Sequence, residues 1–208
     1  MSATPPYKDD LRRAYDVDVD RRGAMTPASW QTCTVDRFLE SAHEVHANKI
    51  IELGCGTGQL ARYVTDRGFD VTAIDLSPAN VAETRKRGIT AKVADFAALP
   101  YADNSFDAAF AMNSLLHVPP DELSNVLVEI ARVLTSRAPL LVVVWGGISH
   151  EGVVADEWLD PPRYFRFYTD DALLALETPG FAFTSFESLD EQEDEVGLHP
   201  QVLTLTTP

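Results

Sequence analysis

The chain has 208 residues, of which 45% are hydrophobic and 24% charged, and its formal net charge is −15 at pH 7. These values are typical of one folded soluble domain with a small appendage, and they exclude a disordered chain, a fibre and a membrane-spanning protein. The longest apolar run, residues 139–145, is far shorter than the roughly 20 residues that cross a bilayer. A surface this acidic should repel nucleic acids and anionic membranes.

The cysteines and the N-terminal residues indicate a cellular compartment. Cys33 and Cys55 are too few for a disulfide scaffold or a four-cysteine zinc site, and we expect no metal. The first residues contain no apolar segment of the kind found in secretory signals. The sequence therefore predicts a cytoplasmic protein. It leaves open whether the chain is a monomer or a dimer.

Strands and helices alternate through the middle of the chain. The expected strands are residues 49–53, 70–75, 89–94, 106–112 and 140–145. The expected helices between them are residues 57–67, 77–87 and 121–134. This alternation predicts an α/β domain whose parallel sheet is covered by helices on both faces.

The two ends of the chain depart from this alternation. Near the C-terminus a helix over 169–176 is followed by two segments of period two, 181–189 and 201–206, with no helix-length segment between them. They should form an antiparallel pair, which adds one antiparallel strand to an otherwise parallel sheet. Near the N-terminus we expect a helix over 28–45, preceded by an irregular acidic segment.

A glycine loop follows the first expected strand. Glu52–Gly58 reads ELGCGTG and opens a helix, so its glycines allow a tight turn and a close approach to a ligand. A dinucleotide-binding loop would need a small residue where Gln59 stands, and a triphosphate-binding loop would need a lysine. A dehydrogenase is therefore a poor fit.

Three acidic residues stand at the ends of neighbouring strands. Glu52 lies beside the glycine loop, Asp75 ends the second strand and Asp95 ends the third. An acid at the position of Asp75 can accept hydrogen bonds from ribose hydroxyls. An acidic crevice without a cation for phosphate suits a nucleoside that carries an ammonium and a sulfonium group. S-adenosylmethionine is such a molecule.

Three motifs in order carry a family resemblance: ELGCGTG, VTAIDLSPANV and VADFAALPYADNSFDAAFAMNSLLHV. Over about residues 48–147 the chain resembles the small, bacterial-type class I S-adenosylmethionine-dependent methyltransferases. The resemblance implies a Rossmann-like, doubly wound sheet of seven strands in the order 3-2-1-4-5-7-6. It also implies S-adenosylmethionine as the cofactor and S-adenosylhomocysteine as the product. Residues 48–208 would form the cofactor-binding domain and residues 1–47 an N-terminal lid.

The resemblance also implies roles for individual residues along the cofactor. The backbone of Gly54, Cys55 and Gly56 would follow its methionine and ribose portions. Glu52 would orient the amino group, and Asp75 would bind both ribose hydroxyls.

The remaining cofactor contacts fall on other strand ends and on the lid. Leu76 and Phe96 would lie near the adenine ring, and Asp95 would accept from its amino group. Met112 would lie beside the sulfonium. In the lid, the best contact candidates are Tyr15, Arg22 and Trp30. Arg22 could equally form only surface salt bridges.

His117 is the candidate catalytic residue, because it follows the fourth strand near the expected cofactor mouth. A histidine there could act as a general base, since its charge changes near neutral pH. It could equally hydrogen-bond the following loop. No Asn-Pro-Pro-Tyr-type tetrapeptide follows this strand, which weighs against the amide, adenine and glutamine methylases that use one.

Aromatic residues crowd the segment after the fifth strand, where this family commonly builds its acceptor site. The candidates for an acceptor wall are Trp145, Trp158, Tyr164, Phe165 and Tyr168. Alternatively, these rings pack the last helix onto the sheet.

Taken together, the sequence predicts an enzyme that methylates O or N of a small molecule. An RNA methyltransferase of the tRNA type is one alternative, although the net charge makes a nucleic-acid partner a poor fit. A non-catalytic cofactor-binding module is the other.

Overall fold

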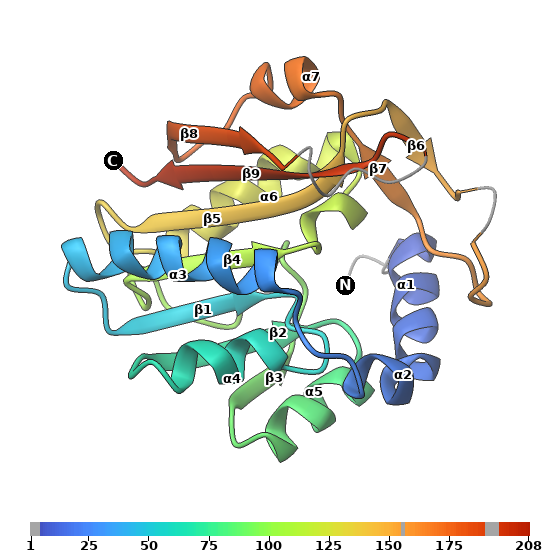
Figure 1. The fold of residues 1–208 in the computed structure, drawn as a ribbon, viewed down its shortest axis with the longest axis horizontal. Coiled ribbons are helices and arrows are strands. Elements are labelled where there is room, and N and C mark those ends of the chain that lie inside the picture. Colours follow the sequence, from blue (N-terminus) through green and yellow to red (C-terminus); the bar gives the residue numbers. More distant parts are fainter. Residues whose placement is uncertain (1–4, 155–156, 190–195) are drawn as a thin grey trace.

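The computed structural model describes residues 5–154, 157–189 and 196–208. Its centre is a seven-stranded sheet in the order β3-β2-β1-β4-β5-β9-β8 (Figure 1). The strands are β1 Lys49–Leu53, β2 Asp70–Asp75, β3 Thr90–Val93, β4 Ala108–Met112, β5 Pro139–Gly146, β8 Ala182–Ser188 and β9 His199–Thr206. Strand β9 runs antiparallel to both of its neighbours, and the other pairings are parallel. The predicted sheet and strand order are therefore confirmed, with β8 and β9 as the sixth and seventh strands.

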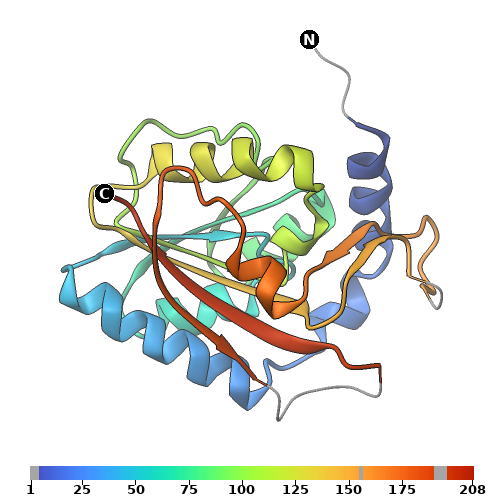
Figure 2. The same ribbon diagram turned by 90° about the horizontal axis from the view of Figure 1, so that it is seen from above.

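Helices cover both faces of the sheet (Figure 2). The first face packs against α3 Ser29–Glu44, α4 Gln59–Thr65 and α5 Pro78–Lys86. The second packs against α6 Pro120–Val133 and α7 Asp170–Leu174. Ile50 and Ile51 are both fully buried, on opposite faces of β1. A strand buried on both faces is apolar throughout, which is why the strands appear in the sequence as short apolar runs.

The predicted irregular acidic segment near the N-terminus is wrong, because this segment forms α1 Pro6–Val17 and α2 Val19–Gly23. Leu11 and Ala14 of α1 are buried at helical spacing, while charged pairs such as Arg12–Asp16 link successive turns on the outside. Such i,i+3 and i,i+4 pairs support a helix that has few apolar residues. The short apolar stripe is hidden among many charges, so periodicity alone does not reveal it.

A small ribbon outside the main sheet also lies beyond the sequence prediction. Strands β6 His150–Gly152 and β7 Phe165–Phe167 pair antiparallel. In both views this ribbon lies beside α1, although the two segments are far apart in the sequence (Figures 1 and 2). A short 3-10 helix, η1 Leu115–His117, lies between β4 and α6 and contacts β7. Together α1, η1 and the ribbon frame the carboxyl ends of the parallel strands.

Candidate functional site

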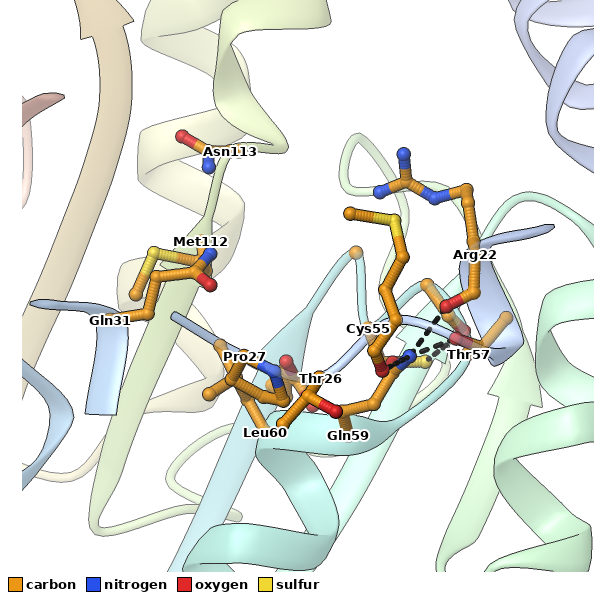
Figure 3. A pocket seen from close by; sticks show the side chains of 14 residues that line it. Arg22, Thr26, Pro27, Gln31, Cys55, Thr57, Gln59, Leu60, Met112 and Asn113 are labelled. Atoms are coloured by element: carbon orange, nitrogen blue, oxygen red, sulfur yellow. Dashed lines mark hydrogen bonds between the residues drawn. The ribbon is translucent and has the colours of Figure 1, made fainter. Parts of the chain in front are cut away.

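Cavities lie at the carboxyl ends of β1, β2 and β4. The strand order reverses here, because β2 and β3 follow on one side of β1 and β4 and β5 on the other. In open α/β sheets this switch point is the usual ligand site. Figure 3 shows one cavity with Arg22 on one side and Met112 and Asn113 on the other, above the glycine loop. Arg22 comes from α2, so the N-terminal segment contributes one wall.

The three glycines of the loop all have left-handed backbone angles, with φ of 77° at Gly54, 52° at Gly56 and 82° at Gly58. A Cβ added at Gly54 would lie 2.4 Å from the Cβ of Ser114, and one at Gly58 would lie 2.7 Å from Thr84 Oγ1. At Gly56 the nearest atom, on the Arg22 guanidinium, is 4.0 Å away. Gly54 and Gly58 are therefore required for packing, whereas Gly56 leaves open space in which a ligand could approach the protein backbone.

Gln59 explains why this loop departs from the dinucleotide pattern. Its side-chain Nε2 donates to the backbone oxygens of Arg22, at 2.7 Å, and Met25, at 3.1 Å. These bonds, drawn as dashed lines in Figure 3, fasten the N-terminal segment onto the glycine loop. A glycine or alanine at this position could not make them.

Asp75 joins the glycine loop to the start of α5. Its carboxylate accepts from the backbone N–H groups of Gly56 and Ser77, each at 2.8 Å, and from Asn80 Nδ2 at 3.3 Å. Burial raises the pKa of Asp75, and these hydrogen bonds oppose the rise. Asp75 and Leu76 line the second cavity, which adjoins the first and shares Arg22, Gly54 and Gly56 with it. The Asp75 carboxylate is thus held rigidly at the edge of this cavity.

Glu52 is the most deeply buried acid of the site, with 2% of its surface exposed. Burial, and then the charge of Asp75, raise its pKa well above the ordinary value of a glutamate, against a weaker opposing effect from the backbone of Ala61. Its Oε2 has no hydrogen-bond partner among the described residues. Arg22 lines the same cavity, and its guanidinium makes no hydrogen bond or ion pair within the described part of the chain. The Arg22 guanidinium lies over the Tyr15 ring, 4.9 Å from its centroid, which leaves its N–H groups free to donate. A buried acid with an unpartnered oxygen and a cation with free donors in one cavity suit the ammonium and the carboxylate of an amino acid.

Asp95 lines a third cavity together with Leu76 and Phe96. Its Oδ2 is bound by Lys8 of α1, whose Nζ lies 2.9 Å from Asp95 and 2.9 Å from Glu122. Burial lowers the pKa of Lys8, but hydrogen bonds to Glu122 and Asp95 outweigh this effect and raise it. Lys8 is therefore a functional candidate that sequence reasoning missed, since nothing in the sequence showed that α1 reaches this strand end.

His117 is 5% exposed and uses both ring nitrogens. Nδ1 lies 2.7 Å from the backbone oxygen of Tyr164, so this nitrogen carries the proton. Nε2, 2.7 Å from Tyr15 Oη, must then accept from that hydroxyl. Burial lowers the pKa of His117 to about 3, although the bond to the Tyr164 carbonyl opposes the shift. The ring is neutral, and its one ring-nitrogen lone pair is already used to accept from Tyr15.

Tyr15 lies at the centre of a network that the sequence did not reveal. Arg163 Nη1 donates to Tyr15 Oη at 3.4 Å, and Arg163 is paired in turn with Glu157 at 2.8 Å. The side chain of Glu157 is only 1% exposed, and burial by itself would raise its pKa, but bonding by Arg163 lowers it. The network therefore joins α1, η1 and the segment around β7 beside the second cavity.

None of the five residues predicted to form an acceptor wall lines the cavities that hold Glu52 and Asp75. Phe165 packs against His117 in a tilted arrangement, with ring centroids 4.9 Å apart, and Tyr164 packs against Tyr7 at 5.7 Å. Trp145 packs instead against Trp30 of α3, at 6.2 Å, where the N-terminal segment passes the sheet.

Two of the predicted wall residues lie elsewhere. Tyr168 lines a separate apolar cavity between η1, α6, α7 and the sheet. Trp158 is 61% exposed and lies under the guanidinium of Arg21, at 4.9 Å from the ring centroid. Neither lines the cavities that hold Glu52 and Asp75.

The sheet order and the helices on both faces define a Rossmann-like fold of the kind found in methyltransferases, and the cavities lie at its switch point. Residues 50–137 match the family model described as "Methyltransferase domain". Over this central part the chain is therefore similar to a methyltransferase domain.

Curated relatives show the same similarity. The chain is 30% identical to the malonyl-[acyl-carrier protein] O-methyltransferase of Halorhodospira halophila over 145 residues, which is 65% of this chain and 48% of that protein. It is 32% identical to the demethylmenaquinone methyltransferase of Renibacterium salmoninarum over 136 residues, or 64% of this chain and 55% of that protein. The chain therefore spans about half the length of the curated relatives it matches.

Solved structures share the fold at lower identity. The [4+2]-cyclase SpnF has a TM-score of 0.74 at 24% identity, over 100% of this chain and 99% of that one. The 1,6-didemethyltoxoflavin-N1-methyltransferase of Burkholderia thailandensis, with bound substrate and S-adenosylhomocysteine, has a TM-score of 0.70 at 20% identity, over 100% and 92%. Among the described residues, no helix combines the length and the apolar character needed to cross a membrane.

Proposed function

We propose that this protein binds S-adenosylmethionine and transfers its methyl group to an oxygen or nitrogen of a small molecule. The observation that carries the proposal is that Glu52, whose buried Oε2 lacks a partner, and the Arg22 guanidinium, which makes no hydrogen bond or ion pair among the described residues, line one cavity. These two groups match the ammonium and the carboxylate of a methionine moiety. The ribose-type acid Asp75 lies in the adjoining cavity.

In this proposal each of the three cavities would take one part of the cofactor. Glu52 and Arg22 would bind its amino acid group, and Asp75 its ribose hydroxyls. Asp95, with Leu76 and Phe96, would hold the adenine. When bound, the cofactor supplies a methyl group on a positively charged sulfur, which is already a good leaving group. This chain's own residues therefore need only bind, orient and exclude water.

Residues 1–47 would act as a lid in this proposal. Within them, Lys8 binds Asp95, Asp16 accepts from Ser77 Oγ at 2.6 Å, and the backbone of Arg22 binds Gln59. Each of these contacts falls on a strand end or loop assigned to the cofactor. Binding of the cofactor and docking of the lid would therefore support one another.

His117 would serve the acceptor side by orienting the Tyr15 hydroxyl beside the second cavity. A proton on Nε2 of His117 would displace this hydrogen bond. The histidine therefore acts through Tyr15 rather than by direct contact with an acceptor.

A small-molecule acceptor fits both the relatives and the charge. The names of the relatives refer to malonyl-[acyl-carrier protein] and demethylmenaquinone, and one structural neighbour is an N1-methyltransferase of didemethyltoxoflavin. A tRNA-type acceptor is disfavoured by the net charge of −15. If RNA is methylated, its binding must weaken steeply with salt, which a titration at several ionic strengths would reveal.

The first test is calorimetric titration with S-adenosylmethionine, S-adenosylhomocysteine and NADH. We expect the two adenosyl ligands to bind and NADH not to bind. Asp75→Ala should weaken the adenosyl ligands at least ten-fold, about 1.4 kcal/mol. Asp70→Ala, at the exposed opposite end of β2, is the matched control and should change nothing. Equal affinity in the Asp75 variant and the wild type would disprove the ribose assignment.

A reaction without methyl transfer is the second candidate, because a [4+2]-cyclase shares the fold over the whole chain. A non-catalytic cofactor-binding module would give the same binding results. Incubation with cofactor labelled at its methyl carbon, against a panel of small acceptors, separates these cases. Label that moves to an acceptor supports methyl transfer, whereas consumption of an acceptor without label would favour the cyclase-like reaction.

A further inference from the structure

The apolar cavity between η1, α6, α7 and the sheet lies apart from the cavities assigned to the cofactor. The described residues that line it are leucines and valines, apart from Arg166, Tyr168 and Thr178. It shares no lining residue with the three cofactor cavities. Leu116 of η1 lines the apolar cavity, whereas the next residue, His117, lines the second cavity. The short helix η1 therefore forms a wall between two separate spaces.

Two hydrogen-bond donors in this lining lack an acceptor. Tyr168 is 8% exposed, and its hydroxyl makes no hydrogen bond within the described part of the chain. The same is true of the buried Nε of Arg166. Thr178, by contrast, donates to the backbone oxygen of Phe181 at 3.4 Å. Because an arginine can only donate, Arg166 cannot accept the phenolic proton of Tyr168, and both groups need an acceptor that the described residues do not supply.

Arg166 also brings an uncompensated positive charge to the cavity. Its Nη1 donates to three neutral oxygens, those of Ser149, His150 and Phe167. No acid among the described residues forms an ion pair with it. Its guanidinium lies 4.1 Å from the centroid of the Tyr168 ring, so the two donors are close enough for the two oxygens of one carboxylate.

The hydroxyl of Tyr168 keeps its proton for such a contact. Burial raises the pKa of Tyr168, and the charge of Arg166 opposes this rise without cancelling it. The exposed Glu151 makes a smaller contribution in the same direction as burial. The phenol is therefore a neutral donor at pH 7.

The size and lining of the cavity define the rest of the ligand. Its volume is about 50 Å³, whereas one water needs about 10–15 Å³ and a cavity of about 150 Å³ can bind benzene. A chain of roughly three carbons fits this space. A water that accepted from both donors would turn its own hydrogens towards leucine side chains. Leu123 and Leu176 are half-buried, so the cavity reaches the surface between α6 and the residues after α7.

We propose that the apolar cavity is a second binding site, for a short aliphatic carboxylate of about four carbons. Its oxygens accept from Tyr168 Oη and Arg166 Nε and neutralise the arginine, and its alkyl chain packs among the leucines. Because this site shares no wall residue with the cofactor cavities, the inference does not depend on the proposed function.

The test is a titration of the protein with butyrate, followed by NMR of isotope-labelled leucine and valine methyl groups. We expect the methyl signals of Leu116 and Leu203, which line the apolar cavity, to shift. Those of Leu60 and Leu76, which line the cofactor cavities, should stay. Acetate should bind about ten-fold more weakly, because it buries two methylene groups fewer. Butylamine, which has the same chain and the opposite charge, should not shift these signals.

Tyr168→Phe removes one donor and keeps the ring. We expect it to weaken butyrate about ten-fold, since a hydrogen bond to a charged oxygen is lost. The variant should be at least as stable as the wild type, because a buried hydroxyl without a partner is removed. Tyr101→Phe is the matched control, because Tyr101 also has a buried hydroxyl without a described partner but does not line this cavity. It should leave butyrate binding unchanged.

Three results would overturn the inference. Shifts confined to Leu60 and Leu76 would place the carboxylate in the cofactor cavities. Equal binding of butyrate and butylamine would show that the two donors do not select an anion. No shift with butyrate, or equal affinity in Tyr168→Phe and the wild type, would mean that the donors are satisfied within the protein. A wild type that binds butyrate but no adenosyl ligand would support this site and overturn only the proposed function.

Discussion

The two sides of the site differ in how their residues are held. On the proposed cofactor side, glycines and acids lie at the ends of adjacent parallel strands, and Asp75 is held by the backbone N–H groups of Gly56 and Ser77. On the acceptor side, side chains from three distant segments meet, as Tyr15, His117 and Arg163 do. The first arrangement is local and is visible as motifs. The second depends on tertiary contacts, so its residues can vary without disturbing the sheet.

The largest effect should come from the glycine loop, because Gly54 has no space for a larger side chain. Gly54→Ala places a Cβ 2.4 Å from Ser114 at a φ of 77°, and we expect a loss of roughly 3 kcal/mol in the free energy of unfolding, from overpacking and backbone strain. Adenosyl ligands should no longer bind measurably. Denaturant unfolding and calorimetry give both quantities.

Gly68→Ala is the matched control for this substitution. Gly68 has a φ of 95°, but no atom lies within 4 Å of the added Cβ. It should lose only about 1 kcal/mol and keep full ligand affinity. If the two alanine variants behave alike, backbone strain alone is responsible and the close approach to Ser114 is unimportant.

The same contrast explains what the sequence could predict. The sheet, its order and the ends of β1 and β2 follow from apolar runs and from loop motifs such as that around Gly54. The ribbon of β6 and β7 and helix α1 were missed, because three-residue strands have no measurable period and because α1 buries only a narrow stripe around Leu11. Candidate acceptor residues were chosen by composition, which does not tell that Tyr168 points into a separate cavity.

Substitution of Glu52 tests whether this buried acid lowers the free energy of unfolding while it strengthens ligand binding. Its pKa is raised by burial, so the folded state loses stability as pH rises from the unfolded pKa towards the folded one. Glu52→Gln removes this charge and should stabilise the protein by roughly 1–3 kcal/mol at pH 8, while weakening S-adenosylhomocysteine about ten-fold. Unfolding at pH 5 and pH 8, with exposed Glu40→Gln as control, measures the first effect and calorimetry the second. Lower stability in Glu52→Gln would show that the carboxylate is satisfied without ligand.

His117 provides the corresponding test on the acceptor side, with the opposite sign. Its pKa of about 3 lies below that of the unfolded chain, so the unfolded state gains a proton first as pH falls below about 6.5. Stability should therefore fall between pH 7 and pH 5. In His117→Gln this fall should be smaller, while the affinity for S-adenosylhomocysteine changes little. Urea unfolding at the two pH values measures this change in the free energy of unfolding. If the change is as large in the variant as in the wild type, the imidazole titrates freely in the folded protein.

The smallest effect should come from the contact that joins the two sides. Lys8 is 7% exposed and binds both Asp95 and Glu122, whose side chains are 32% and 28% exposed, so water moderates the loss of the pair. Lys8→Met should cost about 1–2 kcal/mol of stability and weaken S-adenosylhomocysteine a few-fold, because α1 docks less firmly over Asp95. Arg13→Met, which removes an exposed pair with Asp10 on the same helix, should change neither quantity. If Lys8→Met matches this control, α1 is held by its apolar contacts at Leu11 and Ala14, and the ion pair does not couple the lid to the adenine end.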